Sequence, residues 1–127
     1  MSVAGLGLDV CPVARMREAV ERHGQRFLDR IFTAAEQRYA AGRGNPSEAL
    51  AARFAVKEAA SKALGAPRGI GWHDVEVVPA REGEHGPEVI LRGRALEVAQ
   101  LRGIARVLVS ITHAADVAAA VAVAVTS

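Results

Sequence analysis

The alternation of hydrophobic and polar positions predicts one long helix in the middle of the chain. Residues 50–64 read LAARFAVKEAASKAL, in which Ala, Leu, Lys and Glu are strong helix formers and neither Gly nor Pro interrupts the run. Asn45, Pro46 and Glu48 supply a cap, a first-turn proline and a reciprocal acid before it, and Gly65 follows its last turn. The charged residues of this helix lie among Ala, Leu, Phe and Val, which makes it the first place to look for chemistry.

The start of the chain has the period of a strand. Over residues 2–10, leucines and other apolar side chains alternate with Gly5, Gly7 and Asp9. We expect the leucine face to lie in the core. The glycine face leaves room for another backbone or a ligand to approach where Asp9 projects. Taken alone, Asp9 is better explained as the cap of the helix that follows, with Pro12 in its first turn.

Two shorter helices are predicted between this strand and the central helix. An apolar stripe with outward arginines predicts a helix over 13–23, which Gly24 ends or bends. Thr33 and Glu36 have the spacing of a capping box, which predicts a short helix after them.

The second half of the chain predicts mostly strands. Strands are expected at 75–79, opened by Trp72, His73 and Asp74, and at 88–92, 106–112 and 117–125, with a helix at 94–101. Residues 81–87 connect the first two strands as a hairpin, and the last two flank a tight turn that contains His113 and Asp116. This order indicates a single α+β domain over 1–127, with a mainly antiparallel sheet packed against the long central helix.

Length and composition restrict the class of protein. A chain of 127 residues, half of them hydrophobic, is long enough to bury a core in one domain. No segment reaches the roughly 20 uninterrupted apolar residues that a membrane span needs, and the N-terminus lacks the pattern of a signal peptide. The single Cys excludes an internal disulfide. We therefore expect a cytoplasmic protein that does not bind membranes.

The basic residues are unevenly distributed. The formal net charge is only +2, but five arginines gather in the first third of the chain: Arg15, Arg17, Arg22, Arg26 and Arg30. A local basic surface suits phosphorylated ligands, an acidic protein or nucleic acid. Nucleic acid is the weakest of these because no aromatic residues are interleaved among the arginines, and we expect no nucleic-acid partner.

Three residues form the main candidate for chemistry. Asp9 ends a strand, and Glu58 and Lys62 are one helical turn apart. Two carboxylates and a lysine suit Mg²⁺ that is itself holding phosphate, because Mg²⁺ takes one or two protein carboxylates and completes its shell with water and phosphate oxygens. On spacing alone, an ordinary helix salt bridge between Glu58 and Lys62 is the simpler explanation.

Four motifs change this balance. They are GLGLD at 5–9, RFAVKEAASKALG at 53–65, WHDVEV at 72–77 and SITH at 110–113. Together they resemble the holo-acyl-carrier-protein synthase group of phosphopantetheinyl transferases, in the right order and over nearly the whole chain. The resemblance implies an enzyme that moves 4′-phosphopantetheine from coenzyme A to a serine of an acyl carrier protein in fatty-acid or polyketide synthesis, and releases adenosine 3′,5′-bisphosphate.

The resemblance also implies roles for single residues. Asp9 and Glu58 would bind Mg²⁺ against the pyrophosphate of coenzyme A, and Lys62 would neutralise phosphate charge and assist the leaving group. Three further residues are implied to contact phosphate, a neighbouring subunit or the nucleotide: Arg53, Lys57 and His113. Members of the group are typically homotrimers with active sites between subunits, and arginines of the first helix receive the carrier. Here these are Arg15, Arg22 and Arg26.

The chain departs from the family pattern at two places. Leu108 stands where members commonly have a histidine, and Cys11 and Pro12 stand where many have an acidic or polar residue. The sequence therefore leaves two candidates for the general base. We prefer a metal-bound or phosphate-bound water, and Glu58 is the alternative. Cys11 has no evident base partner and is expected to be a packed thiol.

Two other functions are consistent with the same residues. A metal-dependent hydrolase of nucleotide pyrophosphates would use the same acids without an acidic carrier. A small trimeric binding module would keep the fold without turnover, and Leu108 is the one sequence feature that favours it.

Overall fold

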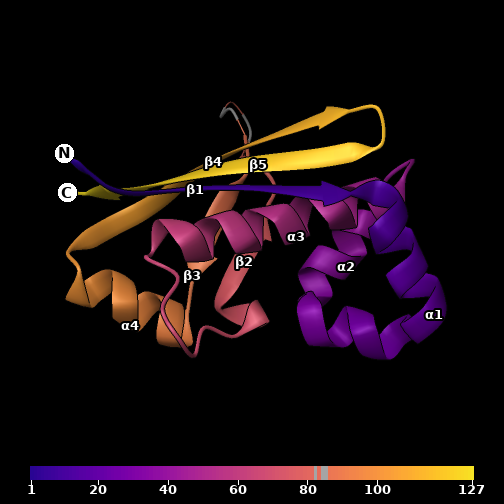
Figure 1. The fold of residues 1–127 in the computed structure, drawn as a ribbon, viewed down its shortest axis with the longest axis horizontal. Coiled ribbons are helices and arrows are strands. Elements are labelled where there is room, and N and C mark those ends of the chain that lie inside the picture. Colours follow the sequence, from indigo (N-terminus) through magenta and orange to yellow (C-terminus); the bar gives the residue numbers. More distant parts are fainter. Residues whose placement is uncertain (82, 84–85) are drawn as a thin grey trace.

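The helices and strands follow the predicted order. A computed structural model describes residues 1–81, 83 and 86–127, and its elements are shown in Figure 1. They are β1 (Val3–Pro12), α1 (Val13–Ile31), α2 (Ala34–Ala41), α3 (Pro46–Ala63), the 3₁₀ turn η1 (Trp72–Asp74), β2 (Val75–Val78), β3 (Glu88–Leu91), α4 (Gly93–Leu101), β4 (Ile104–Ala114) and β5 (Val117–Thr126).

The main sheet is antiparallel and rests on α3. Its strand order is β1-β5-β4, and a separate two-stranded ribbon pairs β2 with β3. In Figure 1 the sheet lies above α3, with α1 and α2 at one end and α4 at the other. The inner face of β5 carries four buried alanines, which let the helix pack closely on the strand: Ala118, Ala120, Ala122 and Ala124. The predicted α+β class and the long central helix are confirmed.

The first strand packs with the opposite face to the one expected. Gly7 lies against the backbone of α3, where an added Cβ atom would overlap the carbonyl oxygen of Ala59, and Gly5 lies in the same way against Ala63. Leu8, in contrast, is 62% exposed. The prediction that the leucine face enters the core is wrong because α3 presents alanines, and only glycine lets two backbones approach so closely.

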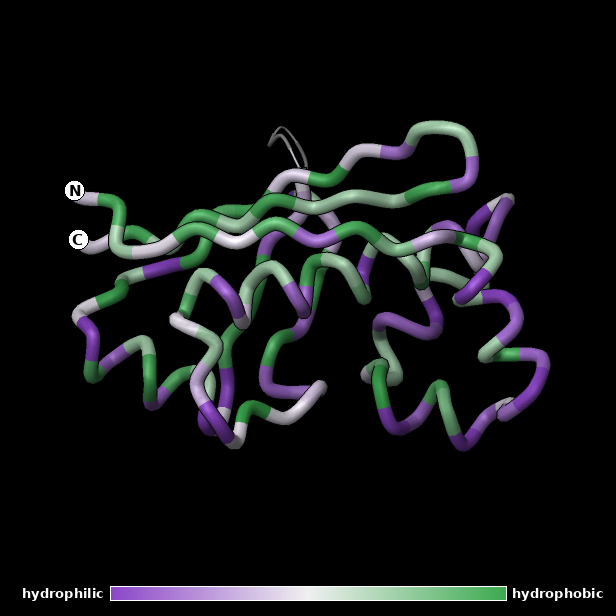
Figure 2. The backbone as a smooth tube through the Cα atoms, viewed as in Figure 1, coloured by the Kyte–Doolittle hydropathy of each residue, from purple (hydrophilic) through white to green (hydrophobic). Residues whose placement is uncertain are grey.

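The outer face of the main sheet is consequently apolar and exposed. Figure 2 shows that the strands of this sheet are mostly hydrophobic, whereas α1 is largely hydrophilic. The register of the three strands places the large exposed side chains on one face: Leu6, Leu8, Val10, Leu108 and Val121. A contiguous apolar face of this kind marks a surface that meets another molecule.

The helix ends follow the local signals with three differences. The prediction that Asp9 caps the first helix is wrong, because Pro12 occupies the cap position of α1 and no side chain caps it. The capping box of Thr33 and Glu36 is present. Asn45 caps α3 by accepting from the Glu48 N–H at 3.1 Å, but the Glu48 carboxylate lies 4.0 Å from His113 Nδ1 instead of returning to the cap. The first helix continues to Ile31 past a kink at Gly24, whose φ of 63° is not helical.

The second half of the chain differs from prediction at two turns. Trp72 to Asp74 form the 3₁₀ turn instead of opening the strand. His113 pairs with Ala118 inside the ladder of β4 and β5, so it belongs to the strand and not to the turn. Val78 pairs with Glu88, which confirms the hairpin, although residues 82, 84 and 85 of its predicted connection lie outside the described residues. None of the described helices is long and apolar enough to cross a membrane.

Candidate active site

The contact between β1 and α3 brings the predicted acids together. The strand runs antiparallel to the helix, with Gly5 beside Ala63 and Gly7 beside Ala59. Two strand residues rise about 6.6 Å and four helix residues about 6 Å, so the two elements stay in step. Asp9 is the next residue on this face of the strand, so it lies near the part of α3 that carries Glu58 and Lys62.

Lys62 ties the two elements together at this point. Its Nζ donates to the carbonyl oxygen of Leu8 at 2.8 Å and lies 3.4 Å from Asp9 Oδ1. The lysine side chain is still 49% exposed, so its charge also faces solvent. Lys62 therefore contacts Asp9 across the strand–helix boundary, and the salt bridge with Glu58 expected from spacing alone is not its main contact.

The electrostatics of Glu58 indicate that the Asp9 carboxylate lies close enough to affect its charge. Burial raises the pKa of Glu58, the Asp9 carboxylate raises it further, and Lys62 opposes both. Among the described residues, no group of three or more His, Cys, Asp or Glu side chains is placed to hold a metal. The donor set is thus two carboxylates with a lysine beside them, which fits Mg²⁺ because this ion keeps several water or phosphate ligands.

A cavity of about 200 Å³ opens beside Glu58. Its walls come from α3 and from the segment that leads into β2: Lys57, Glu58, Ser61, Ile70, Gly71, Trp72 and Val75. The Trp72 ring stacks on Phe54, with 5.2 Å between ring centroids. Trp72 thus packs on the central helix and also forms part of the cavity wall beside Glu58.

A second cavity of about 520 Å³ lies on another side of α3. Arg53 and His113 both line it, and Arg53 stacks over the Tyr39 ring at 3.8 Å from its centroid. Burial lowers the pKa of Arg53, and its buried Nε has no hydrogen-bond partner among the described residues. Such an orphaned donor at a cavity wall suits an anionic ligand.

Arg43 is a lining residue of this cavity that the sequence argument missed. Its guanidinium group lies over the ring of Tyr39, which also lines the cavity, at 5.3 Å from the ring centroid. A sequence signal was available, because Arg43 stands between Gly42 and Gly44 in a loop that precedes a helix N-terminus.

The Lys57 ammonium group is buried and is bound inside the protein. Its side chain is 2% exposed, and Nζ makes an ion pair with Glu36 Oε1 at 2.9 Å. It also donates to the carbonyl oxygens of Trp72 at 2.9 Å and Val75 at 2.6 Å. All three N–H donors are therefore used inside the protein. The prediction that Lys57 contacts phosphate or a subunit interface is wrong for this reason.

The arginines predicted to receive a carrier are exposed on α1. Arg15 and Arg22 precede the kink at Gly24, and Arg26 follows it. A shallow cavity of about 560 Å³ lies along the second half of this helix, with Arg26, Phe27 and Arg30 on its walls.

Cys11 is buried and Leu108 is exposed, and neither side chain has the environment of a catalytic group. Cys11 is 4% exposed, and burial, followed by the nearby Asp9 charge, raises the pKa of its thiol. A thiol with a raised pKa is a poor nucleophile. Leu108 is 44% exposed on the outer face of the sheet.

The comparison with known proteins decides the family. The family model described as the 4′-phosphopantetheinyl transferase superfamily matches residues 5–122. The chain belongs to this superfamily. Two relatives in the 4′-phosphopantetheinyl transferase superfamily are named holo-acyl-carrier-protein synthases. The one from Desulforudis audaxviator is 48% identical over 97% of this chain and 93% of its own length. The one from Chlamydia pneumoniae is 42% identical over 98% of both.

Solved structures of the same enzyme class share the fold. The holo-acyl-carrier-protein synthase of Neisseria meningitidis matches with a TM-score of 0.86 and 32% identity, over 98% of this chain and all of its own. The synthase of Helicobacter pylori in complex with coenzyme A matches with a TM-score of 0.79 and 29% identity, over 94% of this chain and 99% of its own. These matches extend over nearly the whole chain.

Proposed function

We propose that this protein transfers 4′-phosphopantetheine from coenzyme A to a serine of an apo acyl carrier protein, giving the holo carrier and adenosine 3′,5′-bisphosphate. The observation that carries the proposal is the contact of β1 with α3, which brings Asp9 and Glu58 to one point with Lys62 at its edge. The near full-length relatives named for this reaction support it.

The two carboxylates would hold Mg²⁺, which when bound supplies charge neutralisation on the pyrophosphate. The serine hydroxyl oxygen attacks the β-phosphorus of coenzyme A. The bond from this phosphorus to the oxygen that bridges it to the α-phosphorus breaks, and that oxygen leaves with the electron pair on adenosine 3′,5′-bisphosphate. Lys62 places a compact positive charge where the leaving phosphate gains negative charge, and its bond to the Leu8 carbonyl holds it there.

The proton of the serine hydroxyl passes to water in this scheme. Leu108 offers no basic atom at the position where a histidine is common in the family. Glu58 is the alternative acceptor, because its carboxylate lies at the proposed site of transfer. Its carboxylate is already committed to the metal, however, so water remains the preferred acceptor.

The cavity around Arg53 is proposed to receive the nucleotide part of coenzyme A. Arg53, Arg43 and His113 all line this cavity, where the two guanidinium groups would face a phosphate and the imidazole would offer a further hydrogen-bonding group. The orphaned Nε of Arg53 supports this proposal because a bound phosphate oxygen would give it a partner.

We also propose that the protein is a homotrimer whose sites lie between subunits. Arg53 and Glu58 are five residues apart on α3, which turns them about 140° from each other around the helix axis. They line different cavities, so one coenzyme A cannot reach both within a single chain without passing around the helix. A site shared between copies would join the acids of one subunit to the arginines of its neighbour. The exposed apolar face of the sheet supports such an assembly, since it needs a cover.

The carrier protein is proposed to dock on α1. Carrier recognition by charge needs cations that are free of internal acidic partners, and Arg15, Arg22 and Arg26 are all exposed on this helix. An acidic helix of the carrier would be steered to this surface by long-range attraction.

One assay separates the possible functions. The protein is incubated with coenzyme A, Mg²⁺ and an apo carrier, and the mass of the carrier is followed. We expect the carrier to gain one phosphopantetheine group. An unmodified carrier with hydrolysed coenzyme A would indicate a pyrophosphate hydrolase instead. An unmodified carrier with intact coenzyme A would indicate a binding module.

A further inference from the structure

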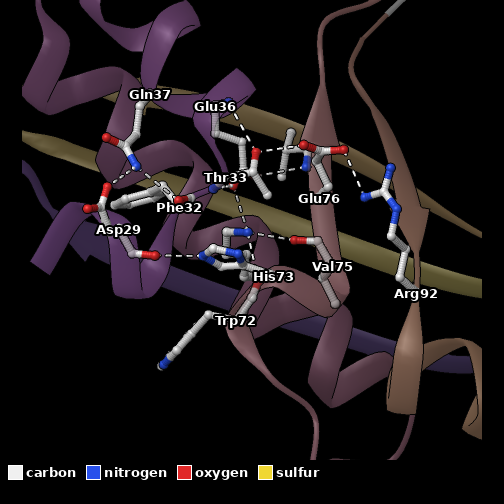
Figure 3. Close-up of polar contacts among 12 residues, drawn as sticks. Asp29, Phe32, Thr33, Glu36, Gln37, Trp72, His73, Val75, Glu76 and Arg92 are labelled. Carbon is white, nitrogen blue, oxygen red and sulfur yellow. Dashed lines mark hydrogen bonds and ion pairs between the residues drawn. The ribbon is translucent and has the colours of Figure 1, made fainter. Parts of the chain in front are cut away.

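A fully buried ion pair lies one residue away from the metal-site acid. Glu36 on α2 and Lys57 on α3 are 2.9 Å apart, with side chains 0% and 2% exposed. Figure 3 shows Glu36 between the helices and β2, directed towards the strand that carries Val75 and Glu76. Glu36 Oε1 also accepts from the Thr33 N–H at 2.8 Å, and Oε2 accepts from the Val77 N–H at 2.9 Å.

Lys57 connects Glu36 to the wall of the cavity beside Glu58. Its other two donors bind the carbonyl oxygens of Trp72 and Val75, at 2.9 and 2.6 Å. These carbonyls belong to the segment that forms one side of the 200 Å³ cavity, and Glu58 lies on the other side. The three bonds of Lys57 therefore set the separation between the helix that bears Glu58 and the segment that faces it.

We propose that Glu36 is a positioning residue for the transfer reaction, which acts through Lys57 to hold the 70–75 segment against α3 and so fixes the cavity beside Glu58. This inference rests on the proposed function. It gives a role to a glutamate that touches no substrate, and it explains why a buried lysine stands directly before the metal-site acid in the chain.

The charges around Lys57 make Glu36 its decisive partner. Burial lowers the pKa of Lys57, the Glu36 carboxylate raises it most among the neighbouring groups, Glu76 on β2 raises it less, and Arg53 on the same helix lowers it. Glu76 is already engaged with Thr33 Oγ1 at 2.6 Å and with Arg92 Nη1 at 2.9 Å. Without Glu36, the ammonium group is left buried with only carbonyl partners, and its hold on the segment weakens.

Glu76→Gln provides a matched control for Glu36→Gln. Both substitutions keep the shape of a largely buried glutamate and remove its charge, but Glu76 makes no hydrogen bond to Lys57 among the described contacts. The full-length variants are assayed with coenzyme A, Mg²⁺ and apo carrier at a temperature where each is folded by circular dichroism. We expect kcat of Glu36→Gln to fall about tenfold to a hundredfold. The KM for coenzyme A should change less than about twofold, because the nucleotide cavity lies elsewhere on α3. Glu76→Gln should keep kcat within about twofold while its midpoint of thermal unfolding falls.

A paired substitution separates positioning from stability. Glu36→Gln with Lys57→Met removes both buried charges, which often restores stability lost by breaking one partner. We expect the double variant to unfold at a higher temperature than Glu36→Gln and still to have the reduced kcat, since Trp72 and Val75 are no longer held. This variant also decides the matter if Glu36→Gln does not fold.

The outcomes distinguish the inference from the function on which it rests. An inactive wild-type chain would overturn the proposed function and the role of Glu36 with it. An active wild type, with a folded Glu36→Gln or double variant that keeps the wild-type kcat, would overturn the role of Glu36 alone. A loss of kcat equal in Glu76→Gln would also overturn it, because the effect would then follow the stability of the network.

Discussion

Gly7 of β1 lies directly against the carbonyl oxygen of Ala59 in α3, with no space for a side chain between them. This contact brings the strand and the helix to backbone-to-backbone distance. Asp9 follows two residues later on the same face of the strand, and Glu58 precedes Ala59 in the helix. The glycine thus determines how closely the two carboxylates approach each other.

Gly7→Ala should separate the strand from the helix. The added methyl group overlaps backbone atoms, which cannot rotate away, so we expect destabilisation of at least about 1–3 kcal/mol in chemical unfolding. If the variant folds, Mg²⁺ should bind more weakly because Asp9 is displaced. Gly42→Ala is the control, since its Cβ atom would make only ordinary contacts, the nearest at 3.7 Å, and it should stay within about 0.5 kcal/mol of wild type. Equal stability of both variants would contradict the close contact.

Glu58→Gln should change both the pH dependence of stability and the response to metal. The pKa of Glu58 is raised in the folded protein, which means that folding favours its protonated form over the ionised form. The stability that the protonated carboxyl contributes is complete below the pKa of the unfolded chain, and it is lost as the pH rises through the folded pKa. At pH 7 the metal-free variant should therefore unfold at a higher temperature than wild type, and the difference should shrink at about pH 4. Calorimetry checks this.

The same variant should not gain stability from Mg²⁺, and its transfer rate should fall on the order of a hundredfold or more. Glu48→Gln is the control because Glu48 lies in the first turn of the same helix, beside His113. It should keep the Mg²⁺ response. A Glu58→Gln protein that Mg²⁺ stabilises as much as wild type would contradict the metal assignment.

Arg15→Glu should weaken carrier binding and leave coenzyme A binding nearly unchanged. The exposed guanidinium is proposed to attract an acidic surface, so the loss should be largest at low salt, where charges are least screened. Arg17→Glu makes the same charge change about 200° around the helix and should have the smaller effect. Titration calorimetry with apo carrier and with coenzyme A measures both affinities. Equal losses for the two ligands would contradict this placement of the carrier.

His113→Ala and Arg43→Ala should lower the preference for the 3′-phosphate of coenzyme A. If this phosphate lies in the cavity that both residues line, each variant should raise KM for coenzyme A about tenfold and leave KM for 3′-dephospho-coenzyme A within about twofold. Steady-state kinetics with the two substrates provides the comparison. A parallel rise for both substrates would place another part of the nucleotide there.

Local signals in the sequence were sufficient to predict most of the helices and strands. Contacts between residues far apart in the chain could not be predicted from them. The capping box of Thr33 and the cap at Asn45 were predicted because their partners are three residues away. The period of β1 identified its two faces but could not tell which is buried, since that depends on the alanine surface of α3. Lys57 was misassigned because its partner, Glu36, comes from a different helix.

The candidate site was predictable in the same uneven way. Specific motifs singled out Asp9, Glu58 and Lys62, and the structure places the three side chains near one another, while their roles stay predictions. Helical spacing places Arg53 and Glu58 on different sides of α3, but the sequence did not reveal the two cavities, because these require the walls that Tyr39 and Trp72 add from other elements.

The central claim is that one active site joins the acids of one subunit to the arginine cavity of its neighbour, and mixing of variants that are impaired in different halves of the site tests it most directly. Glu58→Gln and the double variant Arg43→Ala/His113→Ala are dissociated, mixed, reassembled and assayed for carrier modification at low coenzyme A. The account predicts that the mixture regains activity, because some sites then combine two intact halves. A mixture of Asp9→Asn with Glu58→Gln should stay inactive, since both changes lie in the same half. If the first mixture stays inactive while wild type survives the same treatment, the shared site is contradicted.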